Sequence, residues 1–356
     1  MTTTADAPVR GGAAPSGTPA ARRTARGRRL AVLLVLLLLV VAAGLASIAV
    51  GTRSIGLGDV WRGLLDSDLT TEESVIVRQL RVPRTVLGLM VGAALGVAGA
   101  LMQGHTRNPL GDPGLLGVTA GASLAVVVAI WAFGITSPGG YVWFAFAGAL
   151  AGTVLVYAVG SAGRGGPTPV TLALAGAALS ALLYALVRAI LVSDQQSLDA
   201  FRFWQVGALA GRDADVAWQV APFVVLGLLL AVVNAPALNL LGLGEDVARG
   251  LGQRIWLARA VGLAAITLLC GAATAACGPI AFVGLVVPHV VRALTGPDHR
   301  WLIPGSALAG AVLLLTADVI GRVVARPGEL QVGIVLALVG GPFFLALVRR
   351  RRSMAL

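Results

Sequence analysis

Residues 30–50 read LAVLLVLLLLVVAAGLASIAV, an apolar run without any Asp, Glu, Lys or Arg. A helix of about 20 such residues crosses the hydrocarbon core of a bilayer, whereas the apolar region of a signal peptide is shorter. The run therefore predicts a first membrane helix that is retained. Residues 1–29 are rich in Pro, Gly, Ala, Thr and Arg, and we expect them to form a disordered basic tail in the cytosol.

The composition of the whole chain points the same way. Of its 356 residues, 57% are hydrophobic and 12% are charged, about half the charged share of an ordinary soluble domain. The 47 glycines suit membrane helices, because small residues let helix backbones approach closely. The formal net charge is +11, and the arginines lie between apolar runs and at both ends of the chain. This placement favours membrane topology over nucleic-acid binding.

Apolar runs separated by Gly, Pro and charged residues predict an all-α polytopic membrane protein with about ten transmembrane helices. The predicted spans cover residues 30–51, 85–104, 115–134, 141–160, 169–192, 217–234, 256–276, 280–293, 303–321 and 331–348. An even number of spans places both termini on one side of the membrane. If that side is the cytosol, most of the arginines fall in cytosolic segments, as the positive-inside rule requires.

The arginines that this topology leaves outside form two clusters. Arg78, Arg81 and Arg84 precede the second span, and Arg322 and Arg326 follow the ninth. One interpretation is that these side chains contact lipid headgroups and anchor the helix ends. The other is a docking surface for an acidic soluble partner, because complementary charge steers encounter and fixes the register of two proteins.

Two predicted cytosolic segments differ from simple connections. Residues 104–114 contain two prolines and three glycines, which predict an irregular turn. The longest cytosolic insertion lies around residues 238–254, where Glu245 and Asp246 follow Gly-Leu-Gly and suit a helix start. We expect two short helices there, which lie across the membrane face and meet a cytosolic partner. An ordinary connecting loop is the alternative.

No catalytic or metal-binding pattern is present in the sequence. It has no phosphate-binding Gly-rich loop that ends in Lys-Ser/Thr, and no His pair with metal spacing. Cys270 and Cys277 are interpreted as small buried thiols. Few charges lie within the spans, although Asp318 and Arg322 can pair at i, i+4 on one helix face. We therefore expect no enzyme activity, no cofactor and no metal, and if a solute crosses the membrane here, the energy must come from elsewhere.

Several motifs occur in order between residues 30 and 350. They are Arg81-Val-Pro-Arg84, Arg107-Asn-Pro-Leu-Gly-Asp-Pro-Gly114, Leu241-Gly-Leu-Gly244, Pro288-His-Val-Val-Arg292 and Gly341-Pro-Phe-Phe344. In these motifs the chain resembles the permease subunits of bacterial ABC importers for iron–siderophore complexes, haem and vitamin B12. It departs from them at Gln331, where Pro is common. The resemblance implies the type II importer architecture, with a permease domain at 30–350 and a basic C-terminal tail at 351–356.

The resemblance also implies partners and site residues. It implies a second permease subunit, identical or paralogous, two cytosolic ATPase subunits and an extracytoplasmic substrate-binding protein, assembled at the cytoplasmic membrane. It maps docking of the binding protein onto Arg81, Arg84 and Arg322. It maps ATPase coupling onto residues 238–254, with the candidate residues Gly242, Gly244, Glu245, Ala248 and Gly252.

The resulting prediction is the permease of an ATP-driven importer, with a ferric siderophore as the favoured substrate and vitamin B12 or haem as alternatives. The resemblance maps the pathway walls mainly onto the fifth and tenth spans, and Thr168 and Thr171 are candidates for an inner gate. An ion-coupled secondary transporter would instead need ion sites or inverted repeats. A membrane scaffold or sensor would tolerate loss of the coupling segment. Membrane lipid is an expected partner, and nucleic acid is not.

Overall fold

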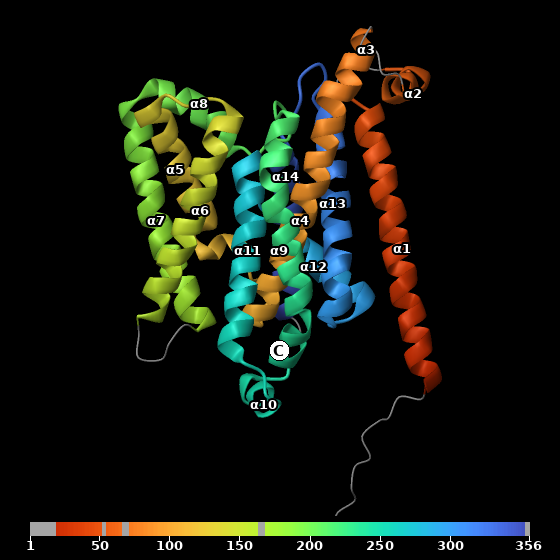
Figure 1. Cartoon of the computed structure of the whole chain (residues 1–356), viewed down its shortest axis with the longest axis vertical. Helices are drawn as coiled ribbons and strands as arrows, with labels where there is room; N and C mark the ends of the chain where they lie inside the picture. The colour runs from red at the N-terminus through yellow and green to blue at the C-terminus, as the bar shows by residue number, and fades with distance from the viewer. Residues whose placement is uncertain (1–18, 52–54, 66–70, 163–167, 353–356) are drawn as a thin grey trace, which may run out of the picture.

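The computed structural model describes residues 19–51, 55–65, 71–162 and 168–352. Within these ranges the regular secondary structure is entirely helical (Figure 1). The elements are α1 (Pro19–Ala49), α2 (Leu57–Leu65), α3 (Glu72–Val75), the π-helix η1 (Ile76–Arg81), α4 (Val82–Thr106), the 3-10 helix η2 (Pro113–Leu116), α5 (Val118–Phe133), α6 (Pro138–Ser161), α7 (Pro169–Ser193), α8 (Gln195–Gln205), α9 (Ala214–Leu241), α10 (Glu245–Gly250), α11 (Ile255–Cys277), α12 (Val283–Thr295), α13 (His299–Val324) and α14 (Val332–Arg352).

Among the described residues, seven helices are long and apolar enough to cross a bilayer. They are α1, the continuous helix Glu72–Thr106 that contains α4, and α6, α7, α9, α11 and α13. The apolar helices α5, α12 and α14 are shorter. For example, the 16 residues of α5 rise about 24 Å, less than a hydrocarbon core of about 30 Å. The predicted spans coincide in position with these helices, which confirms the all-α membrane fold, while the number of complete crossings stays a prediction.

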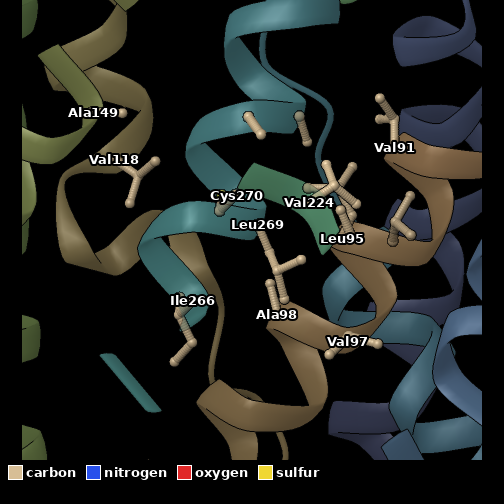
Figure 2. Packing of buried hydrophobic residues seen from close by; sticks show 14 of the residues in the cluster. Val91, Leu95, Val97, Ala98, Val118, Ala149, Val224, Ile266, Leu269 and Cys270 are labelled. Carbon is tan, nitrogen blue, oxygen red and sulfur yellow. The ribbon is translucent and has the colours of Figure 1, made fainter. Parts of the chain in front are cut away.

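The helix that contains α4 lies at the centre of the bundle. In its most apolar 18-residue stretch 78% of the residues are buried, against 6% in α1 at the outer edge. Figure 2 shows apolar side chains around α4, where Leu95 and Ala98 lie near Leu269 of α11 and Val224 of α9. The burial of α4 on all sides follows from its composition of Gly, Ala, Val and Leu, which presents no polar stripe to solvent.

Glycines on α4 permit close approach by two later helices. A Cβ atom added to Gly96 would overlap the carbonyl of Ser306 on α13, and one added to Gly99 would overlap Gly284 on α12. Small residues at such contacts allow dispersion forces to hold membrane helices together at short range. The packing of α4 against α13 also brings the start of α4 next to the end of α13, where the first candidate site lies.

The short elements distinguish the two ends of the bundle. α10, the start of α1 and the end of α14 lie at one end, and α2, α3 and α8 lie at the other (Figure 1). We refer to these as the α10 end and the α8 end. The first and last described helix termini therefore share one end, in agreement with an even number of crossings.

Two predictions about segments need correction. Residues 19–29 form the first turns of α1, because their Ala and Arg residues favour helix, so the predicted disordered tail does not reach residue 29. Residues 1–18 and 353–356 lie outside the described residues, and residues 351–352 end α14. The segment 238–254 contains one short helix, α10, and not two. Its leucine-rich first residues continue α9 to Leu241 and bury Leu238 and Leu241.

Candidate functional site

At the α8 end, the last turn of α1 lies beside the start of α4 and the end of α13. The final carbonyls of a helix have no partner within the helix, and they form the negative end of its dipole. Arg81 supplies donors to two of them. Its Nη1 atom donates to the carbonyl of Ile48 at 2.8 Å and to that of Ala49 at 2.7 Å.

Two arginines from the other outer cluster cap the same helix end. Arg322 Nη1 donates to the carbonyls of Ser47 and Val50, both at 2.9 Å. Arg326 Nη2 donates to the carbonyl of Gly51 at 2.7 Å. Arg81 of the first sequence cluster and Arg322 and Arg326 of the second thus meet at the same helix end. Their immediate role is to place positive charge at the C-terminus of α1, where the helix dipole favours it.

Hydroxyl groups continue this connection between α1 and α4. Arg322 Nη2 donates to the Ser47 hydroxyl at 2.9 Å, and Ser47 Oγ lies 2.8 Å from Thr85 Oγ1. The Thr85 hydroxyl donates to the carbonyl of Arg81 at 2.8 Å. Because the single Thr85 proton is used there, Ser47 is the donor to Thr85. These hydrogen bonds form a continuous series from Arg322 of α13 through Ser47 of α1 to Thr85 of α4. The direction of donation is fixed at every step.

Asp318 of α13 neutralises this positive region from within the bundle. Its side chain is fully buried, accepts a hydrogen bond from Arg84 Nη2 at 2.7 Å and forms an ion pair with Arg322, whose Nη2 atom lies 2.9 Å from Asp318 Oδ2. Arg84 Nη1 also donates to the carboxylate of Glu329, an exposed residue, at 2.9 Å. The predicted i, i+4 pair of Asp318 and Arg322 is therefore confirmed. The second partner of Asp318, Arg84, lies 234 residues away, and no local spacing could have revealed it.

The three predicted docking arginines line a cavity of about 460 Å³ at the α8 end, together with Arg212 and Glu329. The three arginines differ in how accessible their side chains are. Arg81 and Arg322 are only 5% and 3% exposed, and their guanidinium groups bind the end of α1. Arg84 keeps 14% of its side chain accessible, and its partner Glu329 keeps 31%. An incoming acidic group therefore has the most direct access to the Arg84–Glu329 pair.

At the α10 end, Glu245 joins three elements. Its Oε1 atom accepts from Arg107, in the turn after α4, at 3.3 Å, and from Arg259 of α11. Glu245 is also the first residue of α10, where the helix dipole favours a carboxylate. One side chain thus links the predicted coupling segment to two membrane helices. The sequence offered no signal for Arg107 and Arg259 as its partners, since their spacing from Glu245 is not helical.

The glycines of this segment differ in whether their backbone conformation requires glycine. Gly244, which precedes α10, has φ +112° and ψ +149°, a region that essentially only glycine occupies. Gly252, after α10, has φ +81°, which is also left-handed. Gly242 has φ −62° and ψ −23°, an ordinary helical conformation. The buried residue Ala248 packs the helix against the bundle, so α10 is held by two conformationally required glycines and one small inward residue.

The outward surface of α10 and its flanks is apolar. Leu243, Val247 and Leu251 are 64%, 50% and 61% exposed. An interaction surface is a common reason for grouped exposed apolar side chains outside the lipid. These residues lie beside the Glu245 linkage, so a protein bound there would press on an element connected to α4 and α11.

Thr168 and Thr171 form a capping box at the start of α7. The Thr171 amide donates to the Thr168 hydroxyl at 3.1 Å, and the Thr168 amide donates to the Thr171 hydroxyl at 2.9 Å. Pro169 at the first helical position completes this helix start. Thr168 is exposed and Thr171 is half-buried. Their observed contacts thus serve the helix start, and the gate role stays a prediction. Cys270 and Cys277 are buried free thiols, as predicted.

Comparison with known proteins shows consistent similarity along the chain. The FecCD transport family matches residues 37–350. The ferric enterobactin transport system permease protein FepD of Escherichia coli (strain K12) is 46% identical over 324 residues, which cover 91% of this chain and 96% of that protein. The Fe(3+)-citrate import system permease protein YfmD of Bacillus subtilis (strain 168) is 43% identical over 334 residues, 94% of this chain and 98% of that protein. A solved metal-chelate type ABC transporter in an inward-facing conformation has a TM-score of 0.78 and 29% identity, covering 89% of this chain and 98% of that one.

Proposed function

This chain belongs to the FecCD transport family, and from that premise we propose that it is the membrane permease subunit of an ATP-driven importer for a ferric siderophore. The observation that carries the proposal is the similarity over nearly the whole chain to permeases for ferric enterobactin and ferric citrate. The similarity also extends to the fold of a metal-chelate type ABC transporter. Membrane-spanning helices and family membership make the chain a transport component, and the chemistry of ATP hydrolysis belongs to separate subunits.

The α10 end is the surface that we assign to the ATPase subunits. The exposed side chains of Leu243, Val247 and Leu251 offer an apolar contact, and Glu245 connects that contact to Arg107 and Arg259. Movement of a bound ATPase would thereby reach α4 and α11, which form the centre of the bundle. This assignment places the α10 end, and with it both termini, in the cytosol. It keeps Gly242, Gly244, Glu245, Ala248 and Gly252 as the coupling residues, and because Gly242 has an ordinary helical backbone, its role does not require glycine.

The cavity at the α8 end is the surface that we assign to the extracytoplasmic binding protein. Its arginines attract acidic side chains, and charge complementarity increases the rate and specificity of association. Arg84 is the proposed direct contact, because its partner Glu329 is exposed and can be replaced by a carboxylate of the binding protein. Arg81 and Arg322 support this surface by holding the end of α1.

The second permease subunit and the pathway are assigned to α7 and α14. Both helices expose large apolar side chains, which include Leu174 and Leu182 on α7 and Leu338 and Leu345 on α14. The gate proposed near Thr168 and Thr171 lies at the start of α7. A pathway of this kind needs no catalytic group, because alternating access depends on the tilt of helices.

Uptake in a strain that lacks the chromosomal copy tests the proposal. Cells that express this chain together with candidate ATPase and binding-protein subunits are supplied with one iron-labelled chelate at a time: a catecholate, a hydroxamate or citrate. We expect one ferric chelate to accumulate, and accumulation to stop when the ATPase subunit is inactivated. Uptake of haem or vitamin B12 alone would replace the substrate assignment. Transport by the purified chain in liposomes without an ATPase would refute the proposal.

A further inference from the structure

The start of α1 is attached to the bundle by two arginines. Arg28 Nη2 donates to the carbonyl of Leu294 at 3.0 Å, in the last turn of α12. Arg29 Nη1 lies 3.8 Å from Asp298 Oδ2, just before α13. These contacts hold α1, which otherwise lies at the outer edge of the bundle (Figure 1), against the ends of two helices.

A hollow of about 630 Å³ lies beside these contacts, between the start of α1 and the start of α13. Arg26, Arg29 and Arg300 line it, together with one carboxylate, Asp298. That carboxylate is already engaged, because Asp298 Oδ1 accepts from Asn239 Nδ2 at 2.7 Å and its other oxygen faces Arg29. The hollow therefore carries an excess of positive charge.

Two of the lining guanidinium groups are available to a ligand. Arg26 and Arg300 are exposed, and in the described part of the chain neither forms an ion pair. A guanidinium group presents parallel N–H donors that match two oxygens of a phosphate group. The charge and geometry of the hollow thus suit a phosphate monoester or diester more than a simple halide.

The neighbouring surface places the hollow at the level of lipid headgroups. Leu30, Leu34 and Leu38 of α1 are 46%, 61% and 69% exposed, as expected for side chains that face lipid. Arg26 precedes Leu30 by four residues, which is about 6 Å along the helix. The headgroup layer is of about that thickness on each side of the hydrocarbon core. Trp301, a half-buried residue of the hollow, is of a type enriched at this interface.

We propose that this hollow binds the phosphate of an anionic phospholipid. Arg26 and Arg300 contact the phosphate oxygens, Trp301 lies beside the glycerol region, and an acyl chain extends along α1 from Leu33. A free phosphate ion would use the same guanidinium groups but would gain nothing from Leu33 and the exposed leucines that follow it. The site is independent of the transported substrate. Its ligand ties the peripheral helix α1 to α13 at the α10 end.

Native mass spectrometry of the full-length chain in detergent, with any subunits that copurify, tests the site. The probes are dioleoylphosphatidylglycerol, dioleoylphosphatidylcholine and inorganic phosphate. We expect one phosphatidylglycerol to be retained at least fivefold more than phosphatidylcholine. The variant R26Q/R300Q should lose most of this preference, and the matched variant R188Q/R202Q, which changes two exposed arginines elsewhere, should keep it. Millimolar inorganic phosphate should not displace the lipid.

Equal retention of the two lipids by the unmodified chain would overturn the proposal, as would an unchanged preference in R26Q/R300Q. Displacement by inorganic phosphate would assign the hollow to a free ion. A second measurement does not depend on the folding of that variant. Brominated phosphatidylglycerol should quench the fluorescence component of Trp301, taken as the difference between the unmodified chain and W301F, more than brominated phosphatidylcholine does. Equal quenching would contradict the assignment.

Discussion

Arg84 of α4 and Asp318 of α13 form a buried ion pair, with Arg84 Nη2 2.7 Å from Asp318 Oδ1. Asp318 also binds Arg322 on its own helix, so one carboxylate balances two guanidinium groups. The arginines that the predicted topology leaves outside therefore have structural contacts of their own, without any partner protein. They neutralise the end of α1 and are in turn neutralised by Asp318.

Removal of the Asp318 charge should destabilise the protein strongly. In D318N the buried guanidinium group of Arg322 and the largely buried one of Arg84 lose their common counterion, and breaking a buried pair in this way costs about 3–5 kcal/mol. Denaturant unfolding in detergent, followed by tryptophan fluorescence, measures the change. The variant E329Q is the control, since Glu329 is 31% exposed and an exposed pair contributes about 1 kcal/mol or less. Equal losses of stability in the two variants would contradict the role of Asp318 as the main counterion of Arg84 and Arg322.

Docking of the binding protein should depend on Arg84 and on salt. We expect R84Q to lower the affinity of the binding protein for the assembled transporter by about tenfold, which corresponds to about 1.4 kcal/mol. The effect should shrink as salt rises from about 0.05 to 0.5 M, because screening weakens charge–charge contacts. Surface plasmon resonance on transporter in nanodiscs provides the measurement. R202Q, at an exposed arginine of α8, serves as the control. An unchanged affinity at low salt, with R84Q folded, would end the docking assignment.

Gly244 and Gly242 should differ sharply when each is replaced by alanine. In G244A the new Cβ meets no neighbouring atom, but φ +112° imposes a strain of about 1–3 kcal/mol, so α10 should shift and coupling should fail. We expect ATP hydrolysis to continue while uptake falls at least fivefold. In G242A the backbone is already helical, so uptake should stay near the unmodified level. Vesicle uptake and ATPase assays on the same preparation give both readouts, and similar behaviour of the two variants would contradict the backbone argument.

Neutralisation of Glu245 should uncouple the transporter without unfolding it. E245Q leaves Arg107 and Arg259 without their shared carboxylate, and the side chain of Glu245 is 29% exposed, so the stability loss should stay near 1 kcal/mol. The ratio of substrate imported to ATP hydrolysed should fall severalfold. D246N is the matched control, because Asp246 is fully exposed and its one ion pair among the described residues is with Arg249 of α10. A normal ratio in E245Q would show that force reaches the bundle by another contact.

Close packing of α4 against α13 should not tolerate one methyl group at Gly96. The added Cβ of G96A would overlap the carbonyl of Ser306, and overpacking of this kind costs about 1–3 kcal/mol. Separation of the helices should also loosen the Arg84–Asp318 pair at their outer ends. The unfolding midpoint in detergent measures the loss. G58A, whose Cβ would meet no atom within 4 Å, should leave the midpoint nearly unchanged.

The sequence by itself determined the membrane class and the positions of the apolar helices. The free energy of transferring a side chain into lipid depends on that residue alone. A run such as 30–50 can therefore be recognised without knowing its tertiary contacts. The pairing of Asp318 with Arg322 was equally accessible, since residues four apart share a helix face. Thr168 and Thr171, by contrast, are predicted as a gate, although the capping box that they form at the start of α7 follows from the same local rules.

Only the tertiary structure decided what the outer arginines contact and how the coupling segment is held. The close approach of α4 to α13 brings Arg84 to Asp318, and it depends on glycine contacts between helices more than 200 residues apart in sequence. Glu245 meets Arg107 and Arg259 for the same reason, through the packing of α4, α10 and α11. Contacts of this kind arise from the shapes of whole helices, and no spacing within one segment encodes them.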